Sequence, residues 1–272
     1  MSTFVNIKNI QIAYEESGHG IPLLLVHGFP LNNKIWAQQA TGLSDACRVI
    51  MPDLRGHGAS SAPAWSSDQP QPFTMDLLAD DLATFLDAIN IKERIVLAGL
   101  SMGGYVSFAF YRHFPERVAG LVLAATRAGA DSLEAKAGRE QAAKAAIANG
   151  VSAIADAMLP RMFAPQTYQT NPGLVNECRQ IMLNTSLAGV TGDLFGMRDR
   201  IDSTPTLTHI QVPTLVIHGD NDSIFPLQEA KATAEAIPGA QLAIIPGTGH
   251  LLNMEKPDEF NTAVKEFIQS LE

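Results

Sequence analysis

Short apolar runs alternate with longer stretches of helical periodicity along most of the chain. Residues 4–16 alternate polar and apolar side chains, which predicts one or two antiparallel strands. Continuous apolar runs, each typical of a strand buried on both faces, cover residues 21–28, 47–53, 94–99, 118–125, 212–219 and 240–246. Helical spacing predicts helices over 74–90 (with Thr74 as N-cap), 102–114, 227–236 and 257–271. This alternation predicts an α/β fold with a mostly parallel sheet covered on both faces.

One long stretch interrupts the alternation. Residues 128–208 contain no strand-like run, are rich in Ala, Glu, Lys and Met, and show helical periodicity broken by Pro and Gly. An insertion between two parallel strands emerges at the carboxyl ends of the strands, where such sheets bind ligands. We therefore expect a core domain formed by residues 1–127 and 209–272, and a helical cap, 128–208, that covers a site.

Composition and charge exclude several classes of function. The 272 residues fit one α/β domain with an insertion, and 46% hydrophobic and 17% charged residues are typical of a packed globular protein. The formal net charge is −9 and no Lys/Arg-rich run is present, so we expect no nucleic-acid partner. The N-terminal segment has neither the basic start nor the apolar stretch of a signal peptide, and no other segment is apolar enough to span a bilayer. We expect no membrane contact and a cytoplasmic location.

The cysteines and histidines predict no metal site. Cys47 and Cys178 are too few and too far apart for a disulfide framework or a metal centre, so we expect two buried free thiols. No cluster of His, Asp and Glu has the spacing of metal ligands. The expected chemistry therefore uses no metal and no cofactor.

The sequence GLSMG at residues 99–103 lies where a predicted strand turns into a predicted helix. It fits the G-x-S-x-G turn, in which the central residue has a strained backbone and its neighbours must lack side chains. Ser101 is therefore the candidate nucleophile. A serine hydroxyl needs a base, itself oriented by a carboxylate. His250 follows the last strand-like run and is the candidate base.

The carboxylate is expected after the preceding strand, in VIHGDNDSIFP. Asp220 and Asp222 both lie there, and both residue types suit tight turns. Asp220 directly follows the strand-terminal Gly219, which indicates a turn residue, so Asp222 is the preferred acid. The resulting chain order Ser, Asp, His is the one expected for this architecture.

A developing oxyanion needs two donors, and backbone N–H groups supply them without reorganisation. One candidate is the N–H of Met102, at the helix start after Ser101. The other is the N–H of Phe29 in VHGFP, because Pro30 has none and Gly28 allows close approach. In PDLRGHGAS, residues 52–60, the glycine spacing is not that of a dinucleotide fingerprint, so we interpret it as a structural turn.

With these motifs in hand, the chain resembles the α/β-hydrolase superfamily over essentially its whole length. HGFP, DLRGHGAS, GLSMGG, HGDNDSIFP and GTGH occur in the order and spacing of that family. The resemblance implies an eight-stranded sheet flanked by helices, a helical cap after the sixth strand, and a triad of Ser101, Asp222 and His250. Similar epoxide hydrolases and haloalkane dehalogenases carry Asp where this chain has Ser101, which disfavours both activities. LVLAATRAGADS and IPGTGHLLNMEKPDEFN look like bacterial carboxylesterases and 3-oxoadipate enol-lactonase-like hydrolases.

We therefore expect a serine hydrolase that cleaves small-molecule carboxylic esters of short to medium chain length, as a monomer or small homo-oligomer. Residues that either line an apolar substrate pocket or pack between cap helices are Met158, Met162, Phe163, Met182, Leu183, Phe195 and Met197. Methionine adapts to irregular shapes and favours a broad substrate range.

The nearest alternative is a lactonase of the 3-oxoadipate enol-lactone type, whose acidic substrate requires a cation in the pocket. Arg127, just past a predicted strand, is the best candidate, ahead of Arg161, Arg198 and Arg200, and a surface or ion-paired role competes for each. Further alternatives on the same fold are a C–C bond hydrolase, a perhydrolase and a non-enzymatic ligand receptor.

Overall fold

The computed structural model describes residues 2–271, which contain one eight-stranded sheet in the order β1-β2-β4-β3-β5-β6-β7-β8. Strand β2 pairs antiparallel with β1 and β4, and strands β3 to β8 are parallel. The predicted mostly parallel sheet is confirmed, and the N-terminal alternating segment forms two of its strands. The strands are β1 (Thr3–Ile7), β2 (Ile10–Ser17), β3 (Pro22–Val26), β4 (Arg48–Pro52), β5 (Ile95–Leu100), β6 (Val118–Ala124), β7 (Thr214–Gly219) and β8 (Gln241–Ile245).

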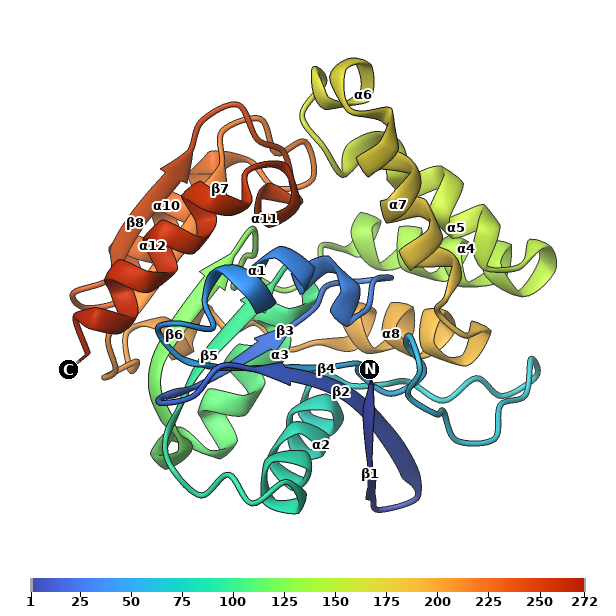
Figure 1. Ribbon diagram of the computed structural model, residues 1–272. Helices are drawn as coiled ribbons and strands as arrows, with labels where there is room; N and C mark the ends of the chain where they lie inside the picture. The colour runs from blue at the N-terminus through green and yellow to red at the C-terminus, as the bar shows by residue number, and fades with distance from the viewer. Residues whose placement is uncertain (1, 272) are drawn as a thin grey trace.

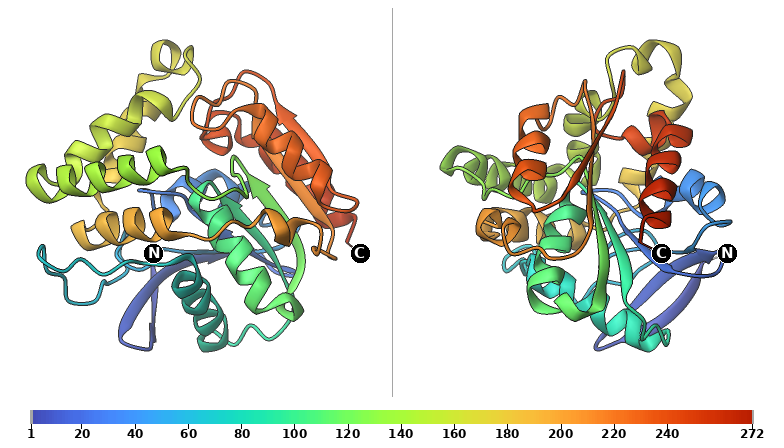
Figure 2. Two further views of the ribbon diagram at one scale, coloured as in Figure 1. Left: turned by 180° about the vertical axis from the view of Figure 1, so that it is seen from behind. Right: turned by 90° about the vertical axis from the view of Figure 1, so that its left-hand side faces the viewer.

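Helices cover both faces of the sheet (Figures 1 and 2). Alternate strand residues point to opposite faces, so Leu24 and Val26 of β3 join one apolar core while Leu23 and Leu25 join the other. The first core includes residues of α2 (Met75–Ala88), α3 (Met102–His113) and α10 (Leu227–Ala236). The second lies against η1 (Asn33–Trp36), α1 (Ala37–Gly42), α11 (Leu252–Glu255) and α12 (Pro257–Gln269). A short 3-10 turn, η2 (Pro115–Arg117), precedes β6.

The α2 boundary shows why the sequence places a helix there. Thr74 has an extended backbone and its hydroxyl accepts the Leu77 N–H at 3.1 Å, as predicted for an N-cap. Helix α10 has the predicted bounds, whereas α2 and α12 end two residues earlier than the periodicity suggests.

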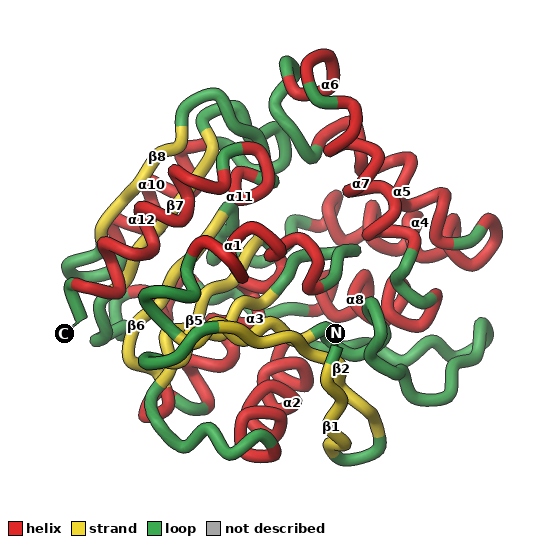
Figure 3. The backbone as a smooth tube through the Cα atoms, in the orientation of Figure 1, coloured by secondary structure: helices red, strands yellow, loops and turns green. Residues whose placement is uncertain are grey.

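Between β6 and β7, a stretch that the structure describes in full, the chain forms helices and no strand. In Figure 3 helices α4 to α7 group together, apart from the helices that flank the strands. We call residues 128–208 the helical insertion. Its elements are α4 (Leu133–Asn149), α5 (Val151–Met158), η3 (Leu159–Arg161), α6 (Thr167–Thr170), α7 (Pro172–Leu183), α8 (Leu187–Asp199) and α9 (Thr204–Leu207).

Helix α8 fastens the insertion to the loop after β4. The His57 Nε2 and Asp193 Oδ2 atoms lie 2.7 Å apart, and both side chains are completely buried. His57 Nδ1 donates to the Leu31 carbonyl at 2.7 Å. Burial alone would lower the pKa of His57, but the Asp193 carboxylate and the Leu31 carbonyl outweigh burial and raise this pKa above its usual value. His57 is therefore a packed, hydrogen-bonded residue within the structural turn of residues 52–60.

The cysteines agree with the expectation from the sequence. Cys47 and Cys178 are free and buried, and desolvation raises the pKa of Cys47 to about 12. Within residues 2–271, no helix combines the length and apolar character needed to cross a membrane.

Two glycines in the insertion provide a matched test of this packing. A Cβ at Gly196 of α8 would lie 1.8 Å from the Phe73 carbonyl oxygen, whereas a Cβ at Gly138 of α4 would meet no atom within 4 Å. We expect Gly196→Ala to lower the free energy of unfolding by about 1–3 kcal/mol through overpacking. Gly138→Ala should raise it by about 0.5–1 kcal/mol, because alanine favours helix more than glycine does. Chemical denaturation measures both, and equal stabilities would contradict the close packing of α8 on Phe73.

Candidate active site

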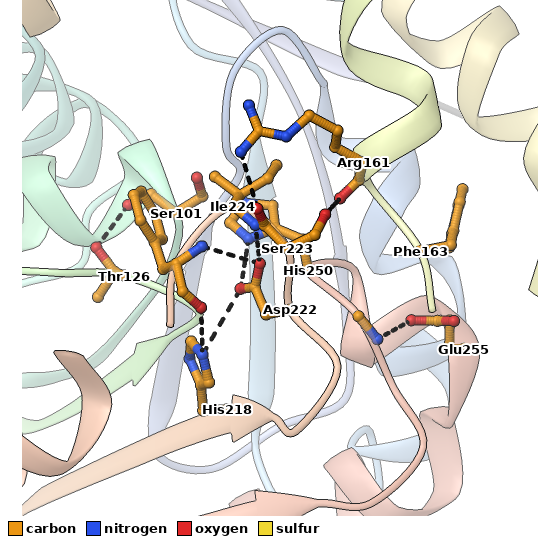
Figure 4. A network of polar contacts seen from close by, with 12 residues as sticks. Ser101, Thr126, Arg161, Phe163, His218, Asp222, Ser223, Ile224, His250 and Glu255 are labelled. Carbon is orange, nitrogen blue, oxygen red and sulfur yellow. Dashed lines mark hydrogen bonds and ion pairs between the residues drawn. The ribbon is translucent and has the colours of Figure 1, made fainter. Parts of the chain in front are cut away.

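Ser101 occupies a sterically enforced turn between β5 and α3. Its backbone has φ 56° and ψ −114°, a conformation that side chains disfavour. A Cβ at Gly99 would lie 2.2 Å from the Gly103 carbonyl oxygen, and a Cβ at Gly103 would lie 2.2 Å from the Val26 carbonyl oxygen. Only glycine fits on either side of the serine. The Thr126 hydroxyl donates to the Ser101 carbonyl at 2.8 Å and helps to hold the turn (Figure 4).

Two backbone N–H groups next to this turn are available to a ligand. Among the hydrogen bonds of residues 2–271, neither the Phe29 N–H nor the Met102 N–H has an acceptor. Met102 is the first residue of α3, so its N–H belongs to the unpaired first turn. Phe29 follows Gly28, where a Cβ would lie 3.1 Å from the Ser101 Cβ. Donors placed beside a hydroxyl in this way can stabilise a negatively charged oxygen.

His27 fixes the loop that carries Phe29. Its Nε2 accepts the Leu54 N–H at 3.0 Å, so Nδ1 carries the proton and donates to the Gly28 carbonyl at 2.9 Å. The ring is completely buried, and desolvation holds the pKa of His27 well below its usual value. A neutral imidazole of fixed tautomer therefore locks this backbone in place.

The loops after β7 and β8 bring Asp222 and His250 together. His250 Nδ1 lies 2.8 Å from Asp222 Oδ2, and the other carboxylate oxygen accepts the N–H groups of Ile224 at 2.7 Å and Phe225 at 3.1 Å. Both side chains are buried. Burial would raise the pKa of Asp222, but the attraction and hydrogen bond of His250 and the two N–H donors outweigh it and lower this pKa. The ionised carboxylate can therefore hold the Nδ1–H tautomer of His250.

Asp220 has a different environment. Its exposed carboxylate accepts the Gly247 N–H at 2.6 Å and the Asn221 side-chain amide at 2.8 Å. These contacts join the two strand-end loops and do not involve His250. Asp220 thus lies where the sequence places a turn residue.

In Figure 4 the dashed line from Ser101 runs to Thr126, and none joins Ser101 to His250. The hydrogen bonds described for residues 2–271 do not include one between the Ser101 hydroxyl and the imidazole. Such bonds often form only when a substrate is bound. Because Nδ1–H donates to Asp222, Nε2 of a neutral His250 can accept a proton. This set of groups can perform acyl transfer.

Two supporting residues could not be recognised from sequence spacing. His218 Nε2 donates to the Phe225 carbonyl at 3.1 Å and lies 3.7 Å from Asp222 Oδ2. Burial lowers the pKa of His218, so this ring supports the Asp222 turn as a neutral donor.

The second supporting residue is Glu255 of α11. One of its carboxylate oxygens accepts the N–H of Gly249, directly before His250, at 2.5 Å. The other accepts the Ala164 N–H at 2.9 Å and the Thr167 hydroxyl at 2.5 Å. Glu255 therefore ties the His250 loop to the helical insertion.

A cavity of about 370 Å³ lies between the core and the insertion. Phe29, Ile224 and Phe225 line it from the core side. The Phe225 and His250 ring centroids are 5.5 Å apart, so one wall residue of the cavity lies against the imidazole, although His250 and Ser101 are not themselves among the lining residues. Among residues 2–271, no three His, Cys, Asp or Glu side chains gather in a way that could hold a metal ion.

The cavity wall differs from the expected one. Of the predicted wall residues, Arg127 and Met158 line the cavity. Those that pack elsewhere are Met162, Phe163, Met182, Leu183, Phe195 and Met197. The first three belong to the second apolar core, and the Phe195 ring lies 4.8 Å beneath the Arg198 guanidinium. For this cavity these residues take the second of their two expected roles, packing between helices. Asp131 and Arg139, which the sequence did not single out, are part of the wall.

Comparison with known proteins gives a consistent set of relatives. A family model described as the alpha/beta hydrolase fold matches residues 21–257. The structure of a thermophilic esterase from Thermogutta terrifontis, with malate bound, is 40% identical with a TM-score of 0.93, over 100% of this chain and 99% of that one. A Synechocystis protein that bears a non-heme chloroperoxidase name is 34% identical over 97% of both chains. The 3-oxoadipate enol-lactonase 2 of Acinetobacter baylyi is 29% identical over 89% of this chain and 86% of its own.

The two neighbouring aspartates allow a direct test of the site. We expect Asp222→Asn to slow covalent labelling by a fluorophosphonate by about a thousandfold or more, because an asparagine no longer holds the reactive imidazole tautomer. Asp220→Asn keeps one acceptor oxygen and should label at close to the unsubstituted rate. Labelling kinetics, with mass spectrometry of the modified peptide, measure both. Equal slowing in the two variants, or labelling away from Ser101, would refute the geometry-based assignment.

Proposed function

The chain belongs to the α/β-hydrolase family, and we propose that it hydrolyses carboxylic esters through an acyl-enzyme on Ser101. The observation that carries this proposal is the buried 2.8 Å contact between His250 and Asp222, in a site whose serine has an enforced positive φ. An esterase structure and an enol-lactonase sequence among the relatives support the same chemistry.

Each group has one role in the proposed mechanism. The Ser101 hydroxyl attacks the ester carbonyl while His250 Nε2 takes its proton. Asp222 holds the imidazole and stabilises its positive charge, and the N–H groups of Phe29 and Met102 bind the oxyanion. His250 then gives the proton to the leaving alcohol, which departs as the acyl-enzyme forms. Water, activated by the same imidazole, releases the acid and restores the serine.

The helical insertion is the cap in this proposal, and residues 1–127 with 209–272 are the core. Both contribute to the wall of the 370 Å³ cavity. That volume lies near the lower end of the range of about 300–1,000 Å³ for small-molecule sites, which favours short to medium acyl groups.

A lactone is the second candidate substrate, because a lactone is a cyclic ester and reaches the same kind of acyl-enzyme. Arg127, the cation that an acidic lactone requires, lines the cavity. The chloroperoxidase name of one relative raises the question of the acceptor. Hydrogen peroxide in place of water would convert the acyl-enzyme to a peroxy acid, so the assay should include it as a competing acceptor.

The first test compares p-nitrophenyl esters from acetate to decanoate. We expect initial rates that are highest for the short chains and fall by at least about 10⁴-fold in Ser101→Ala, because the attacking atom is lost. Stopped-flow measurement of p-nitrophenol release gives both rates, and circular dichroism of the variant verifies its fold.

Two outcomes would overturn this proposal. Turnover that survives in Ser101→Ala would remove Ser101 as the nucleophile. Product release that stops after one equivalent of p-nitrophenol per chain would indicate a ligand receptor that is acylated once.

A further inference from the structure

An ion cluster on the insertion side of the cavity is not used by the proposed mechanism. The Asp131 carboxylate is completely buried and contacts three guanidinium groups. Its distances to nitrogen are 2.8 Å for Arg127, 3.1 Å for Arg139 and 2.6 Å for Arg200. Burial would raise the pKa of Asp131, but the Arg139 and Arg200 guanidiniums outweigh it and lower this pKa. One negative charge therefore faces three positive ones.

Contacts within the protein occupy the Arg200 guanidinium, whereas Arg127 and Arg139 keep N–H donors without a partner among the described residues. The Arg200 side chain is 3% exposed, stacks on Tyr105, and donates to the carbonyls of Met197 at 3.1 Å and Gly129 at 2.6 Å. Arg127 and Arg139 are about a quarter exposed and line the cavity. A guanidinium carries five N–H donors. In the hydrogen bonds of residues 2–271, Arg127 and Arg139 each donate only to Asp131.

The charge of the cavity wall is opposite to that of the protein. The formal net charge of the chain is −9. The charged residues that line the cavity are Arg127, Asp131, Arg139 and Arg161, an excess of positive charge. A wall of this sign attracts anions, and a low-dielectric cavity strengthens the attraction.

Arg127 lies close to the proposed catalytic histidine, and the cavity has open space beside Arg139. The Arg127 guanidinium is 5.3 Å from the centre of the Phe225 ring, and that ring is 5.5 Å from the His250 ring. On α4, the cavity-lining positions recur at helical spacing, and Arg139 is their one long side chain among Ala135, Gly138 and Ala142. A Cβ at Gly138 would meet nothing within 4 Å. Small neighbours thus leave room for a ligand group beside Arg139.

We propose that Arg127 and Arg139 bind a carboxylate at the far end of the acyl chain, so that the preferred substrates are half-esters of short dicarboxylic acids. Planar guanidiniums suit carboxylates because both can form paired hydrogen bonds. Asp131 is the positioning residue that aims the two guanidiniums. This inference rests on the proposed ester hydrolysis at Ser101, and it names the substrate class of that site.

The test uses substrates that differ only in charge. Monomethyl succinate, glutarate and adipate are each compared with the neutral methyl ester in which an isopropyl group replaces the carboxylate. For at least one chain length, we expect kcat/KM to favour the half-ester by about tenfold or more, and this preference should decrease with added salt. Arg139→Gln should reduce the preference by about tenfold to a hundredfold, mainly through the KM of the half-ester, whereas Arg139→Lys should retain part of it.

Arg198→Gln is the matched control. The Arg198 side chain is 25% exposed, compared with 24% for Arg139, and it lies on the same insertion but pairs with Glu140 and Asp199 outside the cavity. We expect the ratio of kcat/KM for the half-ester to kcat/KM for the neutral ester to be the same in Arg198→Gln as in the unsubstituted protein. Thermal melting of each variant verifies the fold.

Binding of glutarate to Ser101→Ala, measured by calorimetry, separates the inference from the function on which it rests. A preference near one, or a preference that Arg139→Gln and Arg198→Gln reduce equally, would overturn the carboxylate site and leave ester hydrolysis standing. If no ester is turned over but glutarate binds and Arg139→Gln weakens its binding, the proposed reaction is wrong and the anion site stands. Absence of both turnover and glutarate binding would overturn both.

Discussion

Helix α3 packs so closely on the ends of β3 and β5 that the turn between β5 and α3 can adopt only one backbone conformation. Glycine at 99 and 103 is the only residue that avoids the neighbouring carbonyl groups, and Ser101 is left with a positive φ that costs about 1–3 kcal/mol. The Ser101 N–H, which donates to the Ala124 carbonyl at 2.9 Å, and the Thr126 hydroxyl offset that cost. The same close packing brings the N-terminus of α3 and the loop after β3 beside one hydroxyl. Strain and the placement of donors are therefore two results of a single contact.

Two buried carboxylates organise the rest of the site, and both have a lowered pKa for a similar reason. The negative charge of Asp222 is stabilised by two backbone N–H donors and by His250, and its interaction with His250 orients one imidazole. Asp131 is compensated by guanidinium groups that outnumber it, so positive charge is left over at the cavity. Asp222 thus orients the proposed catalytic imidazole, whereas Asp131 holds the guanidinium groups that make the cavity wall positive. Neither depends on a bound group for its own stabilisation.

The fold and the proposed triad were accessible from sequence because local rules determine them. Apolar runs mark buried parallel strands, and the turn around Ser101 has a steric requirement that glycines reveal. The cavity wall was less accessible, since helical spacing identifies a buried face but not the element that covers it. The spacing of Met162 and Met182 therefore fitted a pocket wall and a packed core equally well, and both lie in the second apolar core. Contacts such as Asp131 with Arg200 join residues far apart in sequence, and the short helices α1 and α11 have too few turns to show periodicity.

The contacts of the Glu255 carboxylate limit where a small molecule can enter the cavity. The carboxylate binds Gly249 on one side and residues 164 and 167 on the other, and the Leu251 N–H adds a bond to the Met162 carbonyl at 2.9 Å. These bonds therefore couple this end of the insertion to the His250 loop. If this end of the insertion opened to admit substrate, it would pull the His250 loop with it and separate the imidazole from Asp222. In the proposed mechanism, an entrance that leaves His250 in contact with Asp222 therefore lies away from this end of the insertion.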